Sequence, residues 1–241
     1  MDRTLGIILG ILIIVFAAVT AMLGYSAFTD YAYRSTLSGN YTYLCTVTTD
    51  APLYNVTLFV PVPVDTAGNS PTAAAFSSGT IAGIPSGWET TLFDTGKSTL
   101  VKITAPAIIP PQGTKPANPF TISLSSETLS QGAIDTVDPV NNSVLFRPVR
   151  DLKEQPSWSR GFGSRARSFS YTTAVYAEYS TASDTTVTIT SAITGRNSWK
   201  VLEPASNEYH ADVTISMKGT KHGWETMDGE LTSGSGTYIR S

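Results

Sequence analysis

The chain has 241 residues, a formal net charge of −3 and a charged fraction of 15%, well below the fraction of about 25% typical of soluble domains. This weakly acidic balance gives no electrostatic basis for binding nucleic acid. Cys45 is the single cysteine, which excludes an intramolecular disulfide and any cysteine-rich zinc or iron–sulfur site.

An uncharged apolar run extends from Leu5 to Phe28. As a helix it is roughly 36 Å long, enough to cross the hydrocarbon core of a bilayer. The run is longer than the apolar region of a signal peptide, and the best cleavage site, after Ser26, lacks the A-x-A pattern. The sequence therefore predicts a signal-anchor helix over residues 1–29 that binds the lipid bilayer through residues 5–28. A cleaved signal peptide is the alternative.

The flanks of this run bear on its orientation. Arg3 precedes it and Arg34 follows it, so the positive-inside count is nearly balanced. N-glycosylation acceptor triplets begin at Asn40, Asn55 and Asn141, and such sites matter only in an exported chain. An aromatic cluster between residues 25 and 33 suits the membrane–water interface. We therefore expect a single-pass protein of the cell membrane, with its N-terminus inside and the bulk of the chain extracytoplasmic.

Five small residues of the apolar run fall within about 60° of one another on a helix: Gly6, Gly10, Ala17, Ala21 and Gly24. Small residues four apart allow two membrane helices to approach closely. This face predicts helix–helix packing, either self-association or docking on a partner helix. The alternative is that Gly and Ala are simply common in membrane helices.

The remainder reads as β structure in three regions: a β-rich extracytoplasmic region over residues 30–146, a basic linker or loop over 147–168, and a second β-rich half over 169–241, possibly part of the same sandwich. No helix is predicted after the anchor, and residues 65–80 are predicted as a loop. The fold class is therefore all-β, with a β-sandwich as the expected architecture. Ten strands are expected: Tyr41–Val47, Tyr54–Val62, Trp88–Phe93, Ser98–Thr104, Phe120–Leu124, Val144–Phe146, Phe169–Tyr179, Thr185–Ile193, Tyr209–Met217 and Trp224–Leu231.

Two features interrupt this pattern. Arginine and lysine concentrate between Arg147 and Arg167, which suits contact with an acidic partner, an acidic glycan or lipid head groups, or a solvated linker. The tetrapeptide Gly-Trp-Glu-Thr occurs at residues 87–90 and again at 223–226. A duplicated β unit would explain the repeat, and so would chance.

Catalytic chemistry is poorly supported. No phosphate loop, zincin helix, nucleophile elbow or EF-hand loop is present. His210 and Asp212 share a strand face, and with Ser216 or Cys45 they permit a triad only if the fold joins them. The Asp/Asn-rich turn over residues 135–142 suits calcium or an ordinary turn. The tryptophans offer sugar stacking or packing: Trp88, Trp158, Trp199 and Trp224. We predict no catalytic, cofactor or metal site.

The closing region, residues 186–238, reads TVTITSAITGRNSWKVLEPASNEYHADVTISMKGTKHGWETMDGELTSGSGTY. It resembles uncharacterised membrane-anchored envelope proteins of methanogenic archaea, which share one N-terminal membrane helix and a Thr/Ser-rich β exterior. The resemblance implies a location in the cell envelope. It implies no activity and no site residues.

Three functions are consistent with these features. The first is a non-catalytic cell-surface protein with a structural, adhesive or partner-binding role. The second is a pilin-like filament subunit built on the N-terminal helix, although residues 3–6 do not form a convincing processing site for that class. The third is an extracytoplasmic hydrolase, which would require a pocket that joins His210 or His222 to carboxylates.

Overall fold

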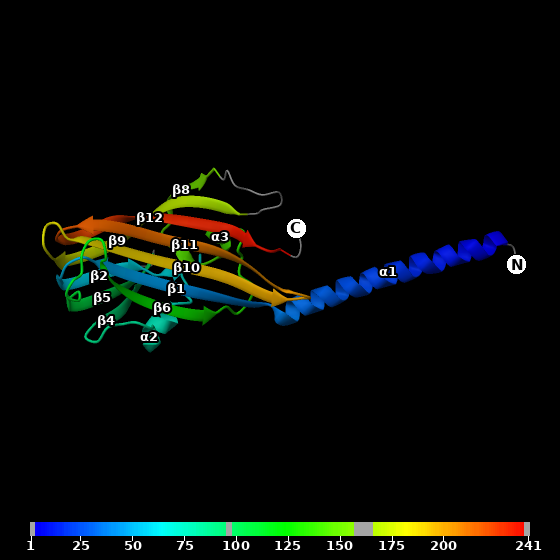
Figure 1. Cartoon of the computed structure of the whole chain (residues 1–241), viewed down its shortest axis with the longest axis horizontal. Helices are drawn as coiled ribbons and strands as arrows, with labels where there is room; N and C mark the ends of the chain where they lie inside the picture. The colour runs from blue at the N-terminus through cyan, green and yellow to red at the C-terminus, as the bar shows by residue number, and fades with distance from the viewer. Residues whose placement is uncertain (1–2, 95–97, 157–165, 239–241) are drawn as a thin grey trace.

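The computed structural model describes residues 3–94, 98–156 and 166–238. One long helix, α1 (Arg3–Thr36), projects from a β-rich head that contains the other described elements (Figure 1). The prediction of an all-β domain preceded by one long apolar helix is therefore confirmed.

The described part of the head contains two short helices and twelve strands. The helices are α2 (Ala73–Ser78) and α3 (Pro139–Asn142). The strands are β1 (Ser38–Thr49), β2 (Leu53–Pro61), β3 (Pro63–Val64), β4 (Glu89–Asp94), β5 (Thr99–Ile108), β6 (Phe120–Leu129), β7 (Leu145–Phe146), β8 (Arg150–Gln155), β9 (Arg167–Ser180), β10 (Thr186–Lys200), β11 (Pro204–Lys218) and β12 (Lys221–Gly236).

Within the described residues, ten strands form one antiparallel sheet in the order β4-β5-β2-β9-β12-β11-β10-β1-β6, with β8 also paired to β9. The strands β3 and β7 pair separately. Strands β9–β12 of the second predicted β region lie side by side in the large sheet, between β2 and β1 of the first region, because β2 pairs with β9 and β1 pairs with β10. Residues on both sides of the basic stretch therefore share one hydrophobic core.

The core lies on the inner face of this sheet, where side chains at every second position are buried. On β11, for example, Tyr209, Ala211 and Val213 are fully buried, and β10 contributes Val187 and Ile189. Intervening positions are mostly polar and face outward; on β10 most of them are Thr or Ser, and on β11 they include His210, Asp212 and Thr214. This is the alternation that the sequence predicts for β9, β10 and β11.

The sheet curls so that its two edge strands are linked by one segment of the chain. Ala82 exchanges two backbone hydrogen bonds with Ser125 of the edge strand β6, with N···O distances of 2.9 and 3.0 Å. The preceding helix α2 contacts β4 at the opposite edge and places Phe76, 6% exposed, against Tyr43 of the core at a ring-centroid distance of 5.9 Å.

Three local predictions are wrong. The basic stretch is not only a linker or loop, because Arg150–Gln155 form strand β8, which pairs with β9. The segment over residues 65–80 is not only loop, because the helix formers Ala73–Ala75 and the buried Phe76 make the short helix α2, which ends at a left-handed Gly79. Tyr54 does not point inward. Asn55 has a positive φ of 54°, which breaks the alternation of β2, so that Leu53 is buried and Tyr54 is 49% exposed.

Helix α1 lies outside the head over its whole apolar length. It is long and apolar enough to cross a membrane over Ile7–Thr36, and its apolar side chains are uncovered, with Phe16 71% and Met22 77% exposed. The predicted packing residues Gly6, Gly10, Ala17, Ala21 and Gly24 all lie in this helix. No other described part of the chain packs on Gly10 or Gly24.

The helix is fixed to the head without a flexible linker, because only Leu37 separates α1 from β1. The backbone N–H of Lys200, at the end of β10, donates to the Thr36 hydroxyl at 2.9 Å. One turn earlier, the Tyr33 ring meets the buried Trp199 edge to face at 5.4 Å. These contacts hold the last turn of α1 against β10 and therefore set the direction of the head relative to the helix.

Candidate binding face

Four aromatic side chains form a row across the outer face of the sheet. We call Phe93, Phe59, Tyr176 and Trp224 the aromatic row; they belong to β4, β2, β9 and β12. Adjacent rings meet edge to face, with centroid distances of 5.5 Å for Phe93–Phe59, 5.5 Å for Phe59–Tyr176 and 5.6 Å for Tyr176–Trp224. Trp224 is 60% exposed and Phe93 45% exposed, so the row presents apolar ring surface to solvent.

The pairing register of the strands brings the rings of the aromatic row together. Phe59 is opposite Tyr176, and Tyr176 is opposite Trp224, so three rings stand on neighbouring strands about 4.8 Å apart. Phe59, Phe93 and Tyr176 are not among the residues that the sequence predicts for a site. A signal was present, because Phe59 and Tyr176 are aromatic residues at outward positions between buried neighbours.

The next row along the same strands is polar. Tyr176 donates from its hydroxyl to Glu178 Oε2 at 2.9 Å, and His222 Nε2 lies 3.5 Å from Glu178 Oε1. The hydrogen bond to the Glu178 carboxylate, with its charge, raises the pKa of Tyr176. His222 is therefore adjacent to one carboxylate on an exposed face.

An open hollow of about 450 Å³ lies beside this polar row. We call it the acidic hollow; its polar lining residues are Asn55, Thr57, Glu89, Thr104 and Glu178. The register separates Glu89 and Glu178 by three strand spacings, or roughly 14 Å between Cα atoms. Neither histidine lines this hollow.

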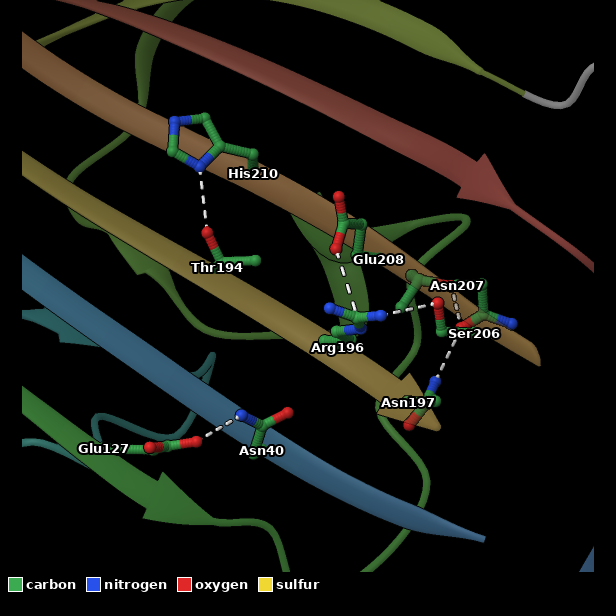
Figure 2. A network of polar contacts seen from close by, with 10 residues as sticks. Asn40, Glu127, Thr194, Arg196, Asn197, Ser206, Asn207, Glu208 and His210 are labelled. Atoms are coloured by element: carbon green, nitrogen blue, oxygen red, sulfur yellow. Dashed lines mark hydrogen bonds and ion pairs between the residues drawn. The ribbon is translucent and has the colours of Figure 1, made fainter. Parts of the chain in front are cut away.

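The three predicted glycosylation asparagines differ in their environments. Asn40 donates from its side-chain amide to Glu127 Oε1 at 2.8 Å (Figure 2), and Asn141 donates to Asp138 Oδ2 at 2.9 Å. The Asn55 amide is exposed and has no side-chain hydrogen bond to the described residues. Asn55 is therefore the acceptor whose amide is freest.

His210 lies on the outer face of β11, away from the aromatic row. Its Nδ1 is 3.0 Å from the Thr194 hydroxyl (Figure 2), and its Nε2 is 3.6 Å from Asp212 Oδ1. Partial burial raises the pKa of Asp212. The nearby Glu230 adds to this increase, whereas His210 reduces it. The expected proximity of His210 and Asp212 is thus present.

The remaining partners of the sketched triad are not brought to His210. Ser216 shares a hydrogen bond with Thr188 at 2.8 Å. Cys45 is fully buried on the inner face, where burial raises the pKa of its thiol. Because the two faces are separated by the sheet, Cys45 cannot meet His210.

A buried amide network closes the end of the head next to α1. Asn197, 4% exposed, donates to the Ile134 carbonyl at 2.8 Å and to Asn207 Oδ1 at 2.9 Å, and it accepts the Ile134 N–H at 2.9 Å. The Asn197–Asn207 contact joins β10 to β11 beneath the exposed Arg196–Glu208 pair (Figure 2). Thr136 also donates to Asn207 Oδ1, at 3.0 Å, so the loop that carries Ile134 and Thr136 is held against the sheet.

The Asp/Asn-rich turn is held by hydrogen bonds of its own. Asp135 accepts the backbone N–H groups of Val137 and Asp138 and the side-chain amide of Asn142. Burial alone would raise the pKa of Asp135, but these bonds lower it overall. Among the described residues, no group of three or more His, Cys, Asp or Glu is placed to hold a metal ion.

Only one of the described tryptophans offers a largely open ring. Trp199 is buried against α1, and Trp88 packs partly buried against the core. Trp158 lies outside the described residues, as do Arg160, Phe162 and Arg165 of the basic stretch.

The two Gly-Trp-Glu-Thr segments occupy different places, because residues 87–90 lead into the edge strand β4 and residues 223–226 lie inside β12.

No protein-family model matches the chain, and no curated protein or solved structure shows significant similarity to it.

Proposed function

We propose that this chain is a single-pass membrane protein that presents a non-catalytic binding head on the outer side of the cell membrane. The observation that carries the proposal is the junction between α1 and the head. An uncovered apolar helix passes into β1 after a single residue and is fixed to β10 through Thr36 and Tyr33.

This junction supports a presenting role. From Phe28 to Thr36 the helix rises about 12 Å, enough to pass through the roughly 5–8 Å of head-group region on one side of a bilayer. The head therefore begins at the membrane surface. Its strands continue away for about 50 Å over the fifteen residues of β10, so that the aromatic row lies in the distal half.

Labelling on intact cells tests the orientation. Ala182 is exposed in the turn between β9 and β10, and the native Cys45 is buried, so an Ala182→Cys variant carries one reactive thiol. A membrane-impermeant maleimide should modify Ala182→Cys on intact cells and leave the wild type unmodified. Modification only after the membrane is permeabilised would place the head inside and refute the proposal.

A filament subunit is the second candidate, because α1 has 34 residues and exposes apolar side chains on all sides. Native extraction in mild detergent separates the two functions. A single-pass binding protein migrates as a monomer or small oligomer, whereas a filament subunit remains in long assemblies.

A further inference from the structure

The sheet has a gap in which strand β9 changes its partner on one side. β9 pairs with β2 as far as Tyr176, opposite Phe59, and with β8 from Thr172, opposite Arg150. Among the described strands, none pairs with residues 173–175 of β9 on that side. The side chains around the gap enclose a notch of about 440 Å³.

We call this notch the arginine notch. It is lined by Ser98, Leu100, Arg147, Pro148, Arg150, Thr173, Ala174 and Trp224. The two arginines come from the basic stretch, and Trp224 comes from the second Gly-Trp-Glu-Thr segment. No carboxylate is among the described residues that line it, in contrast to the acidic hollow. The notch is therefore positively charged and carries one open indole ring.

Arg147 is built into the fold rather than solvated. It is half-buried, donates from Nη2 to the Val140 carbonyl at 2.8 Å, and donates from Nε to the Val64 carbonyl at 3.3 Å. These acceptors are neutral, and no carboxylate in the described chain lies within ion-pair distance of it. Burial lowers the pKa of Arg147, and the charge of Asp65 partly offsets that effect. The guanidinium is therefore compensated only in part by the protein and still attracts an anion.

The residues that line the notch indicate which chemical groups a ligand should carry. An arginine guanidinium binds a carboxylate or sulfate through two parallel N–H···O bonds. The exposed Trp224 ring, together with the half-buried Pro148, offers an apolar wall on which the C–H face of a pyranose ring packs by dispersion and loss of apolar surface to water. Pockets of this kind combine apolar walls with a few polar groups that fix orientation.

The position of the notch argues against lipid head groups as the source of the anion. The strand pairings from β9 through β12 and β11 to β10 place Thr173 and Trp224 level with residues 186–189 of β10. These residues lie eleven to fourteen positions before Lys200, which contacts the end of α1. That is about 40 Å along the strands from the end of α1, farther than a head group reaches.

We propose that the arginine notch binds an anionic sugar, a pyranose that carries a carboxylate or a sulfate, with Arg147 and Arg150 on the anion and Trp224 against the ring. This site adds a ligand class to the binding head and does not depend on which side of the membrane the head occupies.

The test uses the full-length chain in phosphatidylcholine nanodiscs, with binding of D-glucuronate, glucose 6-sulfate, glucose and acetate measured by equilibrium dialysis. Glucuronate or glucose 6-sulfate, or both, should bind, with glucose and acetate each at least about tenfold weaker. Preference between the two anionic sugars identifies the carboxylate or the sulfate as the recognised group. Equal binding of glucose, equal binding of acetate, or no binding at all would overturn the assignment.

Two exposed positions provide variants that leave the fold intact. Arg150→Gln should weaken binding about tenfold, as expected for a lost charge-assisted hydrogen bond, and Trp224→Ala should weaken binding of the sugar but not of acetate. Arg196→Gln, which removes an exposed arginine at the opposite end of the sheet, is the matched control and should bind like the wild type. Unchanged affinity in both notch variants, or displacement of the sugar by a short poly-aspartate peptide at lower concentration, would refute the site.

Discussion

Replacement of Asn197 by alanine should destabilise the head substantially. The side chain is 4% exposed and satisfies both the N–H and the C=O of Ile134. In Asn197→Ala these two backbone groups lose their partners, while Asn207 Oδ1 keeps the hydrogen bond from Thr136. A buried polar group left without a partner costs about 1–3 kcal/mol. For two such groups the loss should be roughly 2–6 kcal/mol in the free energy of unfolding.

Urea unfolding of the full-length chain in detergent, followed by tryptophan fluorescence, measures this loss. With a slope of about 2 kcal/mol per molar urea, the midpoint should fall by roughly 1–3 M. The matched control is Asn118→Ala in an exposed loop, which should move the midpoint by less than about 0.3 M because surface substitutions usually stay within 0.5 kcal/mol. An Asn197→Ala midpoint equal to the wild type would show that the amide network does not hold the loop.

The pH dependence of the unfolding stability of Asn197→Asp tests the same amide network independently. A carboxylate there would face two oxygen acceptors, Ile134 O and Asn207 Oδ1, in a buried position, so folding would raise its pKa above the ordinary value of about 3.9. An acid with a raised folded-state pKa destabilises the protein at pH values above that pKa, and the penalty disappears below the unfolded pKa. Relative to the wild type, Asn197→Asp should therefore be weakest at neutral pH and recover on acidification toward pH 4. A constant difference across that range would contradict the reasoning.

Three further outcomes are expected. Gly195→Ala should lower stability by about 1–3 kcal/mol in the same urea assay, because a Cβ at Gly195 would collide with the buried Tyr209 ring; a stability equal to the wild type would show that the ring moves aside freely. Cys45 should react with a maleimide only after urea unfolding, since its thiol is fully buried, and rapid modification of the folded chain would contradict the buried β1 face. If the chain is glycosylated in its host, mass spectrometry should find the glycan at Asn55 with higher occupancy than at the other two acceptors, and Thr57→Ala should remove it; a glycan confined to the others would contradict the role assigned to the free amide.

The sequence predicts the elements of this fold better than their arrangement. Alternation of apolar residues locates β9, β10 and β11 and their buried faces, because a half-buried strand has a period of two. The same rule fails at Tyr54, where the positive φ of Asn55 reverses the phase. Helix α2 escaped prediction because six residues carry little periodic signal, and its stability comes from Phe76 packing on Tyr43, which lies 33 positions earlier.

The candidate sites depend on strand order, which the sequence does not contain. Phe59, Tyr176 and Trp224 come together only because β2 pairs with β9 and β9 with β12. The arginine notch also depends on the position along β9 where its pairing partner changes from β2 to β8. In the sequence, Arg147 and Arg150 belong to the basic stretch and Trp224 belongs to a repeated tetrapeptide, but nothing local links the two segments.

The central claim is that α1 holds the head upright, with its distal end far from the bilayer. The most direct measurement compares two fluorophores in nanodiscs that contain lipids with a nitroxide on the head group. One fluorophore is attached at Leu202→Cys, exposed in the β10–β11 turn beside the helix junction, and the other at Ala182→Cys, about 50 Å away along the strands. We predict strong quenching at position 202 and none at position 182. Equal quenching at both positions, or stronger quenching at 182, would contradict the account.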